Sequence, residues 1–368
     1  MAADDFTIGV EEEYQIINPE TRELRPRVAR VLPKAREDLG DEVTNEFYQS
    51  QIEIGTPVCR TLADVRAELV RLRRGVVAAA ERDGSRIAAA GTHPFSTWEG
   101  QPITPKPRYF ELHDDFQQLA REQIIFGCHV HVGIADREEA VQAMNRCRPW
   151  LAPIIALSAS SPFWLGAETG YASYRTQLFS RWPMTGTPQV FASRAEYDAC
   201  VASLVAVGMI PDASKIYWDV RLSSHVETLE FRIADVCPTI DEAVMIAGLC
   251  RALARSCVEQ HRRGLPLEPV RPELLDAARW RASRFGLDGE LIDVLAVKSV
   301  PARSLIEAML EFLHPALESS GDWQEVSRLV NRTLEQGNGA KRQLWAFAQG
   351  GRLEDVIDLV LGETSRGL

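Results

Sequence analysis

The chain has 368 residues, of which 45% are hydrophobic and 25% are charged, so it can bury a large core and is not intrinsically disordered. Its 41 basic and 52 acidic residues give a formal net charge of −11. That balance argues against a nucleic-acid-binding protein, because such proteins gain much of their affinity by neutralising phosphates. An anionic substrate would therefore have to meet local arginine side chains or a metal ion.

The sequence also predicts a cytoplasmic protein that contacts no membrane. No run approaches the roughly 18 consecutive apolar residues of a membrane span, and residues 1–5 lack the basic and apolar regions of a secretory signal. The seven cysteines are scattered, odd in number and without a C-x-x-C pair. This pattern is typical of reduced thiols rather than of a disulfide framework or a zinc site.

In chain order, strand-like segments alternate with a few helices up to about residue 235, and the chain from about residue 239 onward is almost entirely helical in character. β-Branched and aromatic residues beside turn formers predict strands at 7–17, 43–58, 86–91, 123–133, 216–222 and 226–234. Helices are expected at 61–82, 194–208 and 240–263, with N-caps at Thr61, Ser193 and Thr239. Strands without regularly alternating helices favour an α+β fold with an antiparallel sheet.

The first strand carries two acids on one face. Side chains alternate along a strand, so Glu11 and Glu13 project together while Glu12 points away. Two neighbouring carboxylates repel each other unless a cation lies between them. The segment therefore predicts either a cation site or a solvated acidic edge strand.

A second acidic segment follows at 43–58. Glu53 lies between Ile52 and Ile54, which is an unusual place for a charge without a partner. Glu46 is an odd number of positions away, so strict alternation puts it on the opposite face from Glu53. If both serve one site, the segment needs a bulge, or Glu46 must lie on a loop.

Two histidines and an acid–arginine pair complete the polar face. His129 and His131 share one face of the strand at 123–133; a lone strand histidine usually belongs to the core, but two together indicate metal or substrate contact. Glu230 and Arg232 share a face of the strand at 226–234, and Arg221 lies on the strand before it. The alternative for Glu230 and Arg232 is a structural ion pair.

Together these strands predict an oxygen-rich site with few nitrogen ligands, which suits Mg²⁺ or Mn²⁺ better than zinc. Carboxylates around divalent ions with arginines close by suit phosphoryl transfer, since the ions hold the triphosphate and arginine stabilises charge on the moving group. The sequence contains neither G-x-x-x-x-G-K-[ST] nor G-x-G-x-x-G. Phosphate binding must therefore rest on metals and side chains.

Seven motifs follow one another along the chain. They are Gly-Val-Glu-Glu-Glu-Tyr at 9–14, Gln-Ile-Glu-Ile-Gly-Thr-Pro at 51–57, Ala-Gly-Thr-His-Pro-Phe at 90–95, Gly-Cys-His-Val-His-Val-Gly at 127–133, Ser-Ala-Ser-Ser-Pro-Phe-Trp at 158–164, Gly-Tyr-Ala-Ser-Tyr-Arg at 170–175 and Thr-Leu-Glu-Phe-Arg-Ile-Ala-Asp-Val-Cys-Pro at 228–238. In this order they resemble the bacterial carboxylate–amine ligases of the type-2 glutamate–cysteine ligase group, within the glutamine-synthetase-like superfamily. The resemblance runs from about residue 6 to about residue 290.

The resemblance implies a curved antiparallel sheet that cups the active site, with a catalytic domain at 1–300 and a helical extension at 301–368 packed on the same domain. It implies ATP-dependent amide formation, in which the γ-carboxylate of glutamate becomes an acyl phosphate and an amine, cysteine or another small amine, displaces phosphate. The substrates would be ATP, glutamate and that amine, with Mg²⁺ or Mn²⁺ as cofactor. A homodimer is expected, since dimers are the commonest closed assembly.

Matching motif by motif, the resemblance also implies residue roles. The expected metal ligands are Glu11, Glu13, Glu46, Glu53, His129 and Glu230. The expected catalytic residues are Arg232, which would contact the transferred phosphoryl group, Glu230 and Glu53. The expected substrate-binding residues are Arg175 and Tyr171 from the motif at 170–175, with Arg221 and His131 as further candidates.

Two other functions fit the same residues. A metal-dependent hydrolase could use His129, His131 and the carboxylates to activate water, and it would turn over its substrate without ATP. A catalytically degenerate relative could bind an amino acid or a nucleotide without reacting.

Overall fold

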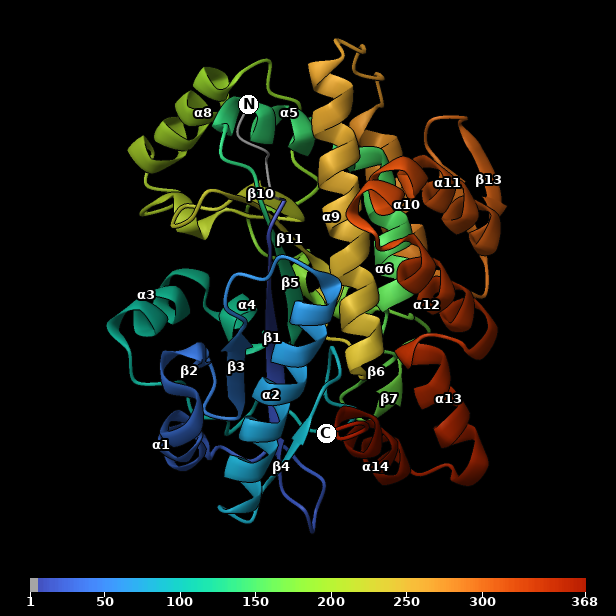
Figure 1. The fold of residues 1–368 in the computed structure, drawn as a ribbon. Coiled ribbons are helices and arrows are strands. Elements are labelled where there is room, and N and C mark those ends of the chain that lie inside the picture. Colours follow the sequence, from blue (N-terminus) through green and yellow to red (C-terminus); the bar gives the residue numbers. More distant parts are fainter. Residues whose placement is uncertain (1–5) are drawn as a thin grey trace.

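A seven-stranded antiparallel sheet forms the centre of the computed structural model, which describes residues 6–368 (Figure 1). Its order is β10–β11–β5–β1–β3–β2, and β4 pairs with β1 on the same edge as β5. The strands are β1 (Ile8–Ile17), β2 (Val43–Asn45), β3 (Gln51–Gly55), β4 (Arg86–Ala88), β5 (Gly127–Gly133), β10 (Val220–Leu222) and β11 (Thr228–Asp235). The predicted α+β class with an antiparallel sheet is confirmed. Residues 1–5, on which the prediction about a secretory signal rests, lie outside the described residues.

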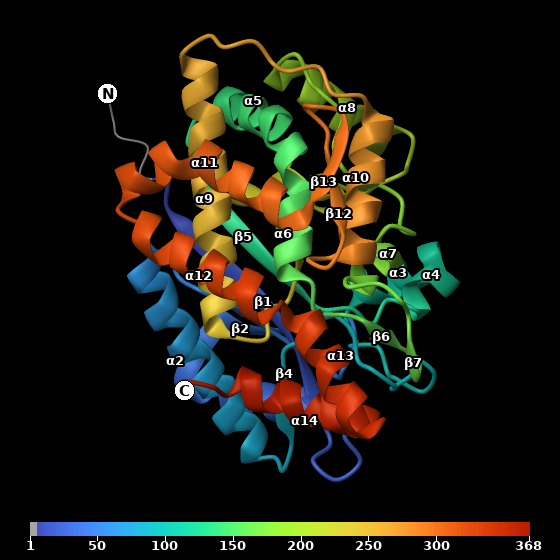
Figure 2. The same cartoon turned by 90° about the vertical axis from the view of Figure 1, so that its right-hand side faces the viewer.

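Helices bury one face of this sheet (Figure 2). Helix α2 (Leu62–Glu81) contacts β1, α6 (Leu151–Ser158) contacts β11, and α9 (Ile240–Arg262) contacts β1, β5 and β11. The apolar side chains of β1 that face them, such as Val10 and Tyr14, are at most 1% exposed. Burial of this face supplies the favourable free energy that holds the strands in register.

Glu12 lies on the opposite face of β1 from its neighbours Glu11 and Glu13. It points to the helix side of β1, where its carboxylate pairs with Arg73 of α2 at 2.5 Å and accepts a hydrogen bond from the Tyr14 hydroxyl. Arg73 also donates to the carbonyl oxygens of Cys237 and Pro238. The buried charge pair is therefore fully hydrogen-bonded, and Glu11 and Glu13 are left for the opposite face.

The remaining elements surround the sheet. The other helices are α1 (Val28–Leu39), α3 (Pro107–Phe116), α4 (Gln118–Arg121), α5 (Arg137–Cys147), α7 (Tyr174–Phe179), α8 (Arg194–Ala206), α10 (Pro272–Phe285), α11 (Ala302–Ser320), α12 (Trp323–Gln336), α13 (Gly339–Gly350) and α14 (Leu353–Thr364). The other strands are β6 (Phe163–Trp164), β7 (Ala167–Glu168), β8 (Thr185–Gly186), β9 (Tyr217–Trp218), β12 (Glu290–Asp293) and β13 (Lys298–Pro301). Among residues 6–368, no helix has the length and apolar character that a membrane span requires.

Two predicted strands are each divided in the structure. The segment 43–58 forms β2 and β3, an antiparallel pair joined by a turn, rather than one strand. The segment 216–222 forms β9, which pairs in parallel with β8, and β10, which pairs with β11. Asp219 separates β9 from β10, and its side chain binds Arg279 at 2.8 Å. A polar side chain held by a distant helix interrupts the second strand, and local propensity does not reveal that contact.

The three predicted N-caps are found in the structure at the starts of α2, α8 and α9. Thr61 and Thr239 are N-caps in complete capping boxes that begin α2 and α9. Ser193 caps α8, but the carboxylate of Glu196 accepts from the backbone of Ala192 instead of Ser193. The chain after 239 is not entirely helical, because β12 and β13 form a hairpin whose turn is held by Asp293 through the backbone N–H groups of Leu295 and Ala296.

The C-terminal helices pack closely on the rest of the molecule. Helices α11 and α12 contact α9, and α14 contacts β4. Arg342 pairs with Glu242 at 2.9 Å, and Gln343 Nε2 donates to the carbonyl oxygen of Ser160 at 2.8 Å. The expected boundary after residue 300 falls within β13. The division into a catalytic domain and an extension stays a prediction, and these contacts support packing of 301–368 on the same body.

Candidate active site

The strand register brings the predicted site residues together on the sheet face opposite α2 and α9. Glu11 lies opposite His129, Glu13 opposite Glu53, and Glu230 opposite His131. Their side chains line a cavity of about 370 Å³. The other predicted site residues that line it are Glu46, Arg175, Arg221 and Arg232.

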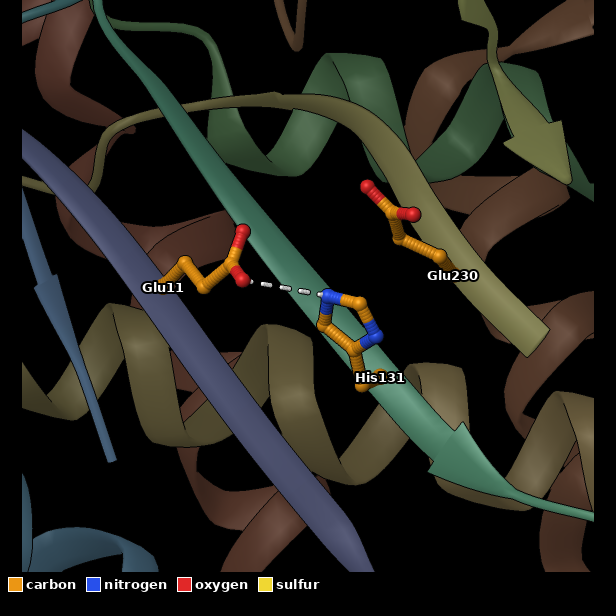
Figure 3. A group of neighbouring side chains, drawn as sticks. All are labelled: Glu11, His131 and Glu230. Atoms are coloured by element: carbon orange, nitrogen blue, oxygen red, sulfur yellow. Dashed lines mark ion pairs between the residues drawn. The ribbon is translucent and has the colours of Figure 1, made fainter. Parts of the chain in front are cut away.

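Two groups of possible metal ligands share Glu11. One is Glu11, His131 and Glu230 (Figure 3), and the other is Glu11, Glu53 and His129; in each group the three ligand atoms lie within 4.8 Å of one another. Carboxylate oxygens with one imidazole nitrogen per group suit Mg²⁺ or Mn²⁺. His131, which was expected to contact substrate, is therefore placed as a possible metal ligand.

Glu13 and Glu53 form a pair of acids whose mutual repulsion a bound cation would relieve. Burial raises the pKa of Glu13 to about 7, and the charge of Glu46 adds to this effect. Burial and the charges of Glu46, Glu11 and Glu13 raise the pKa of Glu53 well above its ordinary value. Two carboxylates directly opposite each other on neighbouring strands destabilise the sheet when both are ionised. Glu13 lies beside the two ligand groups and accepts a hydrogen bond from Gly127 N at 2.5 Å.

Both histidines contact Glu11. The Glu11 carboxylate lies 3.2 Å from His129 Nδ1 and 3.4 Å from His131 Nε2. Although burial alone would raise the pKa of Glu11, the hydrogen bonds of His129 and His131 and the charge of His131 hold it well below 4.5. Burial and the charge of Arg232 lower the pKa of His129 to about 4, so its imidazole is neutral and can offer a lone pair to a metal.

Glu230 is held by two arginines. Arg221 binds it through two hydrogen bonds of 2.8 and 3.1 Å, and Arg232 Nη1 donates to the same carboxylate. Although burial opposes ionisation, Arg232 and Arg221 lower the pKa of Glu230 far below its ordinary value. The predicted alternative of a structural acid–arginine pair is thus present, but it is buried and it lines the cavity. Arg221 was expected to bind substrate, whereas its donors bind Glu230 and the carbonyl oxygens of Ser214 and Ile216.

Glu46 lies on the turn between β2 and β3, so the alternation along the segment does not restrict it. Its carboxylate accepts from Phe47 N at 3.1 Å and from the Tyr109 hydroxyl at 3.3 Å. It lines the cavity without belonging to either ligand group.

Arg175 lines the cavity over Gly127 at the start of β5, at 3% exposure. A Cβ atom at Gly127 would collide with Arg175 Nη2, so glycine is required where the arginine passes the strand. Arg175 Nε has no hydrogen-bond partner among residues 6–368. Asp235, buried beneath it, accepts hydrogen bonds from Ser160 N and from the Ser161 and Ser173 hydroxyls. Three of the sequence motifs thus meet at Asp235 and position Arg175.

Tyr171 lies outside the cavity lining, contrary to the prediction that it contacts substrate. Its hydroxyl accepts from Trp280 Nε1 at 3.3 Å, and the Arg284 guanidinium lies 5.5 Å from its ring centroid. The motif that contains Tyr171 turns into α7 at Ser173, which carries Arg175 inward and leaves Tyr171 against α10.

Sequence reasoning missed the other end of the cavity. Lys215, Arg108 and Gln123 line it, together with the aromatic rings of Trp182 and Tyr217. These side chains come from a short turn, from α3, from β9 and from connecting segments. No periodic pattern marks them, and only the cluster of polar and aromatic residues at 214–218 could have drawn attention to this part of the chain.

Comparison with known proteins now identifies the family. The model of glutamate-cysteine ligase family 2 matches residues 7–359. The chain is 44% identical over 373 residues to "Putative glutamate--cysteine ligase 2-2" of Frankia alni, covering 98% of this chain and 97% of the relative. It is 40% identical over 363 residues to a like-named protein of Rhodopirellula baltica, covering 97% and 96% of the two chains. The chain belongs to glutamate-cysteine ligase family 2.

Solved structures agree on the fold. The glutamate–cysteine ligase of Francisella tularensis, solved in complex with AMP, superposes with a TM-score of 0.70 at 10% identity and covers 98% of this chain and 89% of its own. A bifunctional glutathione synthetase from Pasteurella multocida gives 0.71 at 16% identity, covering 98% of this chain and 51% of its own. The predicted family and enzyme class are confirmed: this member of glutamate-cysteine ligase family 2 is an ATP-dependent carbon–nitrogen ligase.

The stability of this ligase without metal should fall as pH rises from about 5 to 8. The raised pKa of Glu13 means that the folded state holds a proton that the unfolded state releases above 4.5, so the stabilisation is present below that pH and is lost as pH rises through about 7. Urea unfolding in a chelating buffer should show a loss on the order of 1–3 kcal/mol. Excess Mg²⁺ should abolish most of that loss.

Glu53→Gln provides the matched test. It should raise the melting temperature in chelator at pH 8, because the repulsion with Glu13 is removed, and it should weaken stabilisation by Mg²⁺. Glu311→Gln, on the exposed side of α11, is the control and should change neither quantity. If the stability of wild type and of Glu53→Gln without metal depended on pH in the same way, repulsion between Glu13 and Glu53 would be contradicted.

Glu230→Ala should destabilise the fold as well as the site. Removing this carboxylate leaves Arg221 and Arg232 buried without their partner, which typically costs about 3–5 kcal/mol. The free energy of unfolding in urea measures this loss. Glu259→Ala removes one member of a partly exposed pair on α9 and should cost less than about 1 kcal/mol. Equal effects of the two substitutions would show that the arginines do not depend on Glu230.

Proposed function

We propose that this ligase activates the γ-carboxylate of glutamate with ATP and joins it to an amine, cysteine or another small amine. The observation that carries the proposal is the pair of ligand groups sharing Glu11, with Arg232 and Arg175 lining the same cavity. Carboxylates for divalent ions and arginines for phosphate and carboxylate groups are what such a reaction requires.

The residues present fit divalent metal ions. Glu13 and Glu53 are partly buried acids with raised pKa values, directly opposite each other, and a cation would relieve their repulsion. Glu11, Glu53, His129, His131 and Glu230 would hold the ions, with Glu13 and Glu46 beside them. Bound there, Mg²⁺ or Mn²⁺ would neutralise the charge of the triphosphate.

Arg232 is suited to the transferred phosphoryl group. Its Nη1 is held by Glu230, its side chain is 14% exposed, and its Nε has no hydrogen-bond partner among residues 6–368. A guanidinium fixed in this way is pre-organised to donate to phosphoryl oxygens without a reorganisation cost. Its charge would stabilise the transition state as a glutamate γ-carboxylate oxygen attacks the γ-phosphorus and ADP leaves.

Arg175 is suited to the substrate carboxylate. It is buried and unpartnered at Nε, and its nearest acid, Asp235, lies 3.9 Å away and is occupied by serine donors. A planar guanidinium binds carboxylates with two parallel hydrogen bonds. Holding glutamate there would leave its γ-carboxylate for phosphorylation; the amine nitrogen then attacks the acyl carbon and phosphate leaves.

The reaction can be tested directly by phosphate release. With Mg²⁺ and ATP we expect release that depends on glutamate and increases with an accepted amine, while a panel of amines including cysteine identifies the acceptor. Mass spectrometry should find the γ-glutamyl amide. Turnover of an amide or ester substrate without ATP would instead support the metal-dependent hydrolase. Absence of glutamate-dependent phosphate release with any divalent metal would refute the ligation of glutamate.

Arg232→Lys should lower kcat by about 100-fold or more while the KM for ATP changes little. The charge remains, but the planar fork that holds Glu230 and reaches the phosphoryl oxygens is lost. Arg303→Lys, on the exposed face of α11, is the control and should behave as wild type. A normal kcat in Arg232→Lys would remove this residue from the mechanism.

A further inference from the structure

Lys215 is a buried cation without a partner in the cavity. It ends a short turn, Ala213–Lys215, that Asp212 caps by accepting from Ser214 N at 2.8 Å. The side chain lines the cavity, the residue is 9% exposed, and Nζ has no hydrogen-bond partner among the described residues. An ammonium group in such a place is costly unless an anion joins it.

The groups around Lys215 do not supply that anion. Burial and the neighbouring Arg108 both lower its pKa, and the acids that oppose this effect are Asp212, Glu46 and Glu111. Asp212 is engaged by Ser214 N, and Glu46 by Phe47 N and the Tyr109 hydroxyl. None of the three acids forms an ion pair with Lys215 within residues 6–368.

A second unsatisfied donor lines the same cavity. Gln123 is 9% exposed, and its Nε2 has no partner among residues 6–368, while its Oε1 accepts from Trp182 Nε1 at 2.6 Å. The Trp182 ring packs edge-on against Tyr217 with 5.6 Å between centroids. The cavity thus offers a cation, a neutral donor and an aromatic wall, a combination that suits a carboxylate attached to a small apolar body.

Lys215 and Arg108, the Lys215 group, lie on different elements from the metal ligands. The acids and histidines of the ligand groups come from β1, β3, β5 and β11, whereas Lys215 and Arg108 come from the turn before β9 and from α3. Arg175 lies over Gly127 of β5 and is assigned to glutamate. The Lys215 group is therefore available to the other amino substrate.

We propose that Lys215 binds the carboxylate of the amine acceptor and thereby determines the preference for an α-amino acid over its decarboxylated amine. Gln123 would donate to the same carboxylate, and the acceptor side chain would pack against Trp182 and Tyr217. This inference rests on the proposed function, since it assigns the acceptor in that reaction.

The test compares acceptors with and without the carboxylate in Lys215→Met. The pairs are L-cysteine with cysteamine and L-leucine with 3-methylbutylamine, measured by phosphate release with Mg–ATP and glutamate. Wild type should favour the amino acid of an accepted pair by about ten- to hundredfold in kcat/KM, the usual strength of a hydrogen bond to a charged group. Lys215→Met should abolish that preference with the KM for glutamate and ATP unchanged. Lys215→Arg should partly restore it.

Other outcomes overturn the assignment. A rise in the KM for glutamate or ATP in Lys215→Met would place Lys215 at one of those substrates instead. A preserved carboxylate preference would exclude it from acceptor binding. Lys215→Met should also raise the melting temperature without substrates, because an unpaired buried ammonium is replaced by an apolar side chain; a fall would indicate a structural role. Lys298→Met, on exposed β13, is the control.

A readout independent of turnover separates this inference from the proposed function. Calorimetric titration of wild type and Lys215→Met with the two amino acids and the two amines needs no catalysis. If wild type releases no phosphate with any amine, the proposed function fails, while weaker binding of the amino acids alone to Lys215→Met would still support a carboxylate site. Equal binding to both proteins would refute that site.

Discussion

The repulsion between Glu13 and Glu53, held directly opposite each other on β1 and β3, is the constraint on which the rest of the structure depends. A sheet normally avoids two like charges in that position. Here both pKa values are raised, so without a cation the pair tends to retain protons. The register is maintained by the buried opposite face of β1, where Val10 and Tyr14 pack under the helices. The hydrophobic face thus keeps in place a polar face that would not assemble by itself.

The arginines on the two sides of the sheet divide into those with internal partners at every nitrogen and those with a free donor. Arg73 and Arg221 have internal partners: the first pairs with Glu12 behind the sheet, and the second, in the cavity, binds Glu230 and two carbonyl oxygens. Arg175 and Arg232 each keep a partnerless Nε among the described residues. Arginines of the first kind position the site, and arginines of the second kind can bind an anion. Neither the burial nor the charge of an arginine would by itself distinguish the two kinds.

Support for the site extends well beyond its lining. Asp235 collects hydrogen bonds from Ser160, Ser161 and Ser173, and Arg175 lies against it. Gly127 leaves room for the arginine and donates its N–H to Glu13. The serine-rich motif at 158–164 and the tyrosine-rich motif at 170–175 of this chain thus form a frame for one guanidinium, and Tyr171 itself faces α10 and not the cavity.

The sequence alone determined which side chains share a face, because side-chain direction alternates along any strand. It therefore separated Glu12 from Glu11 and Glu13, and placed His129 with His131. Its seven motifs also indicated the family correctly. The tertiary structure decided which strands are neighbours, that β2 and β3 are joined by a turn carrying Glu46, and that Arg221 holds Glu230. It alone brought Lys215 and Gln123 to one cavity, because contacts between distant irregular segments depend on packing and leave no periodic trace in the chain.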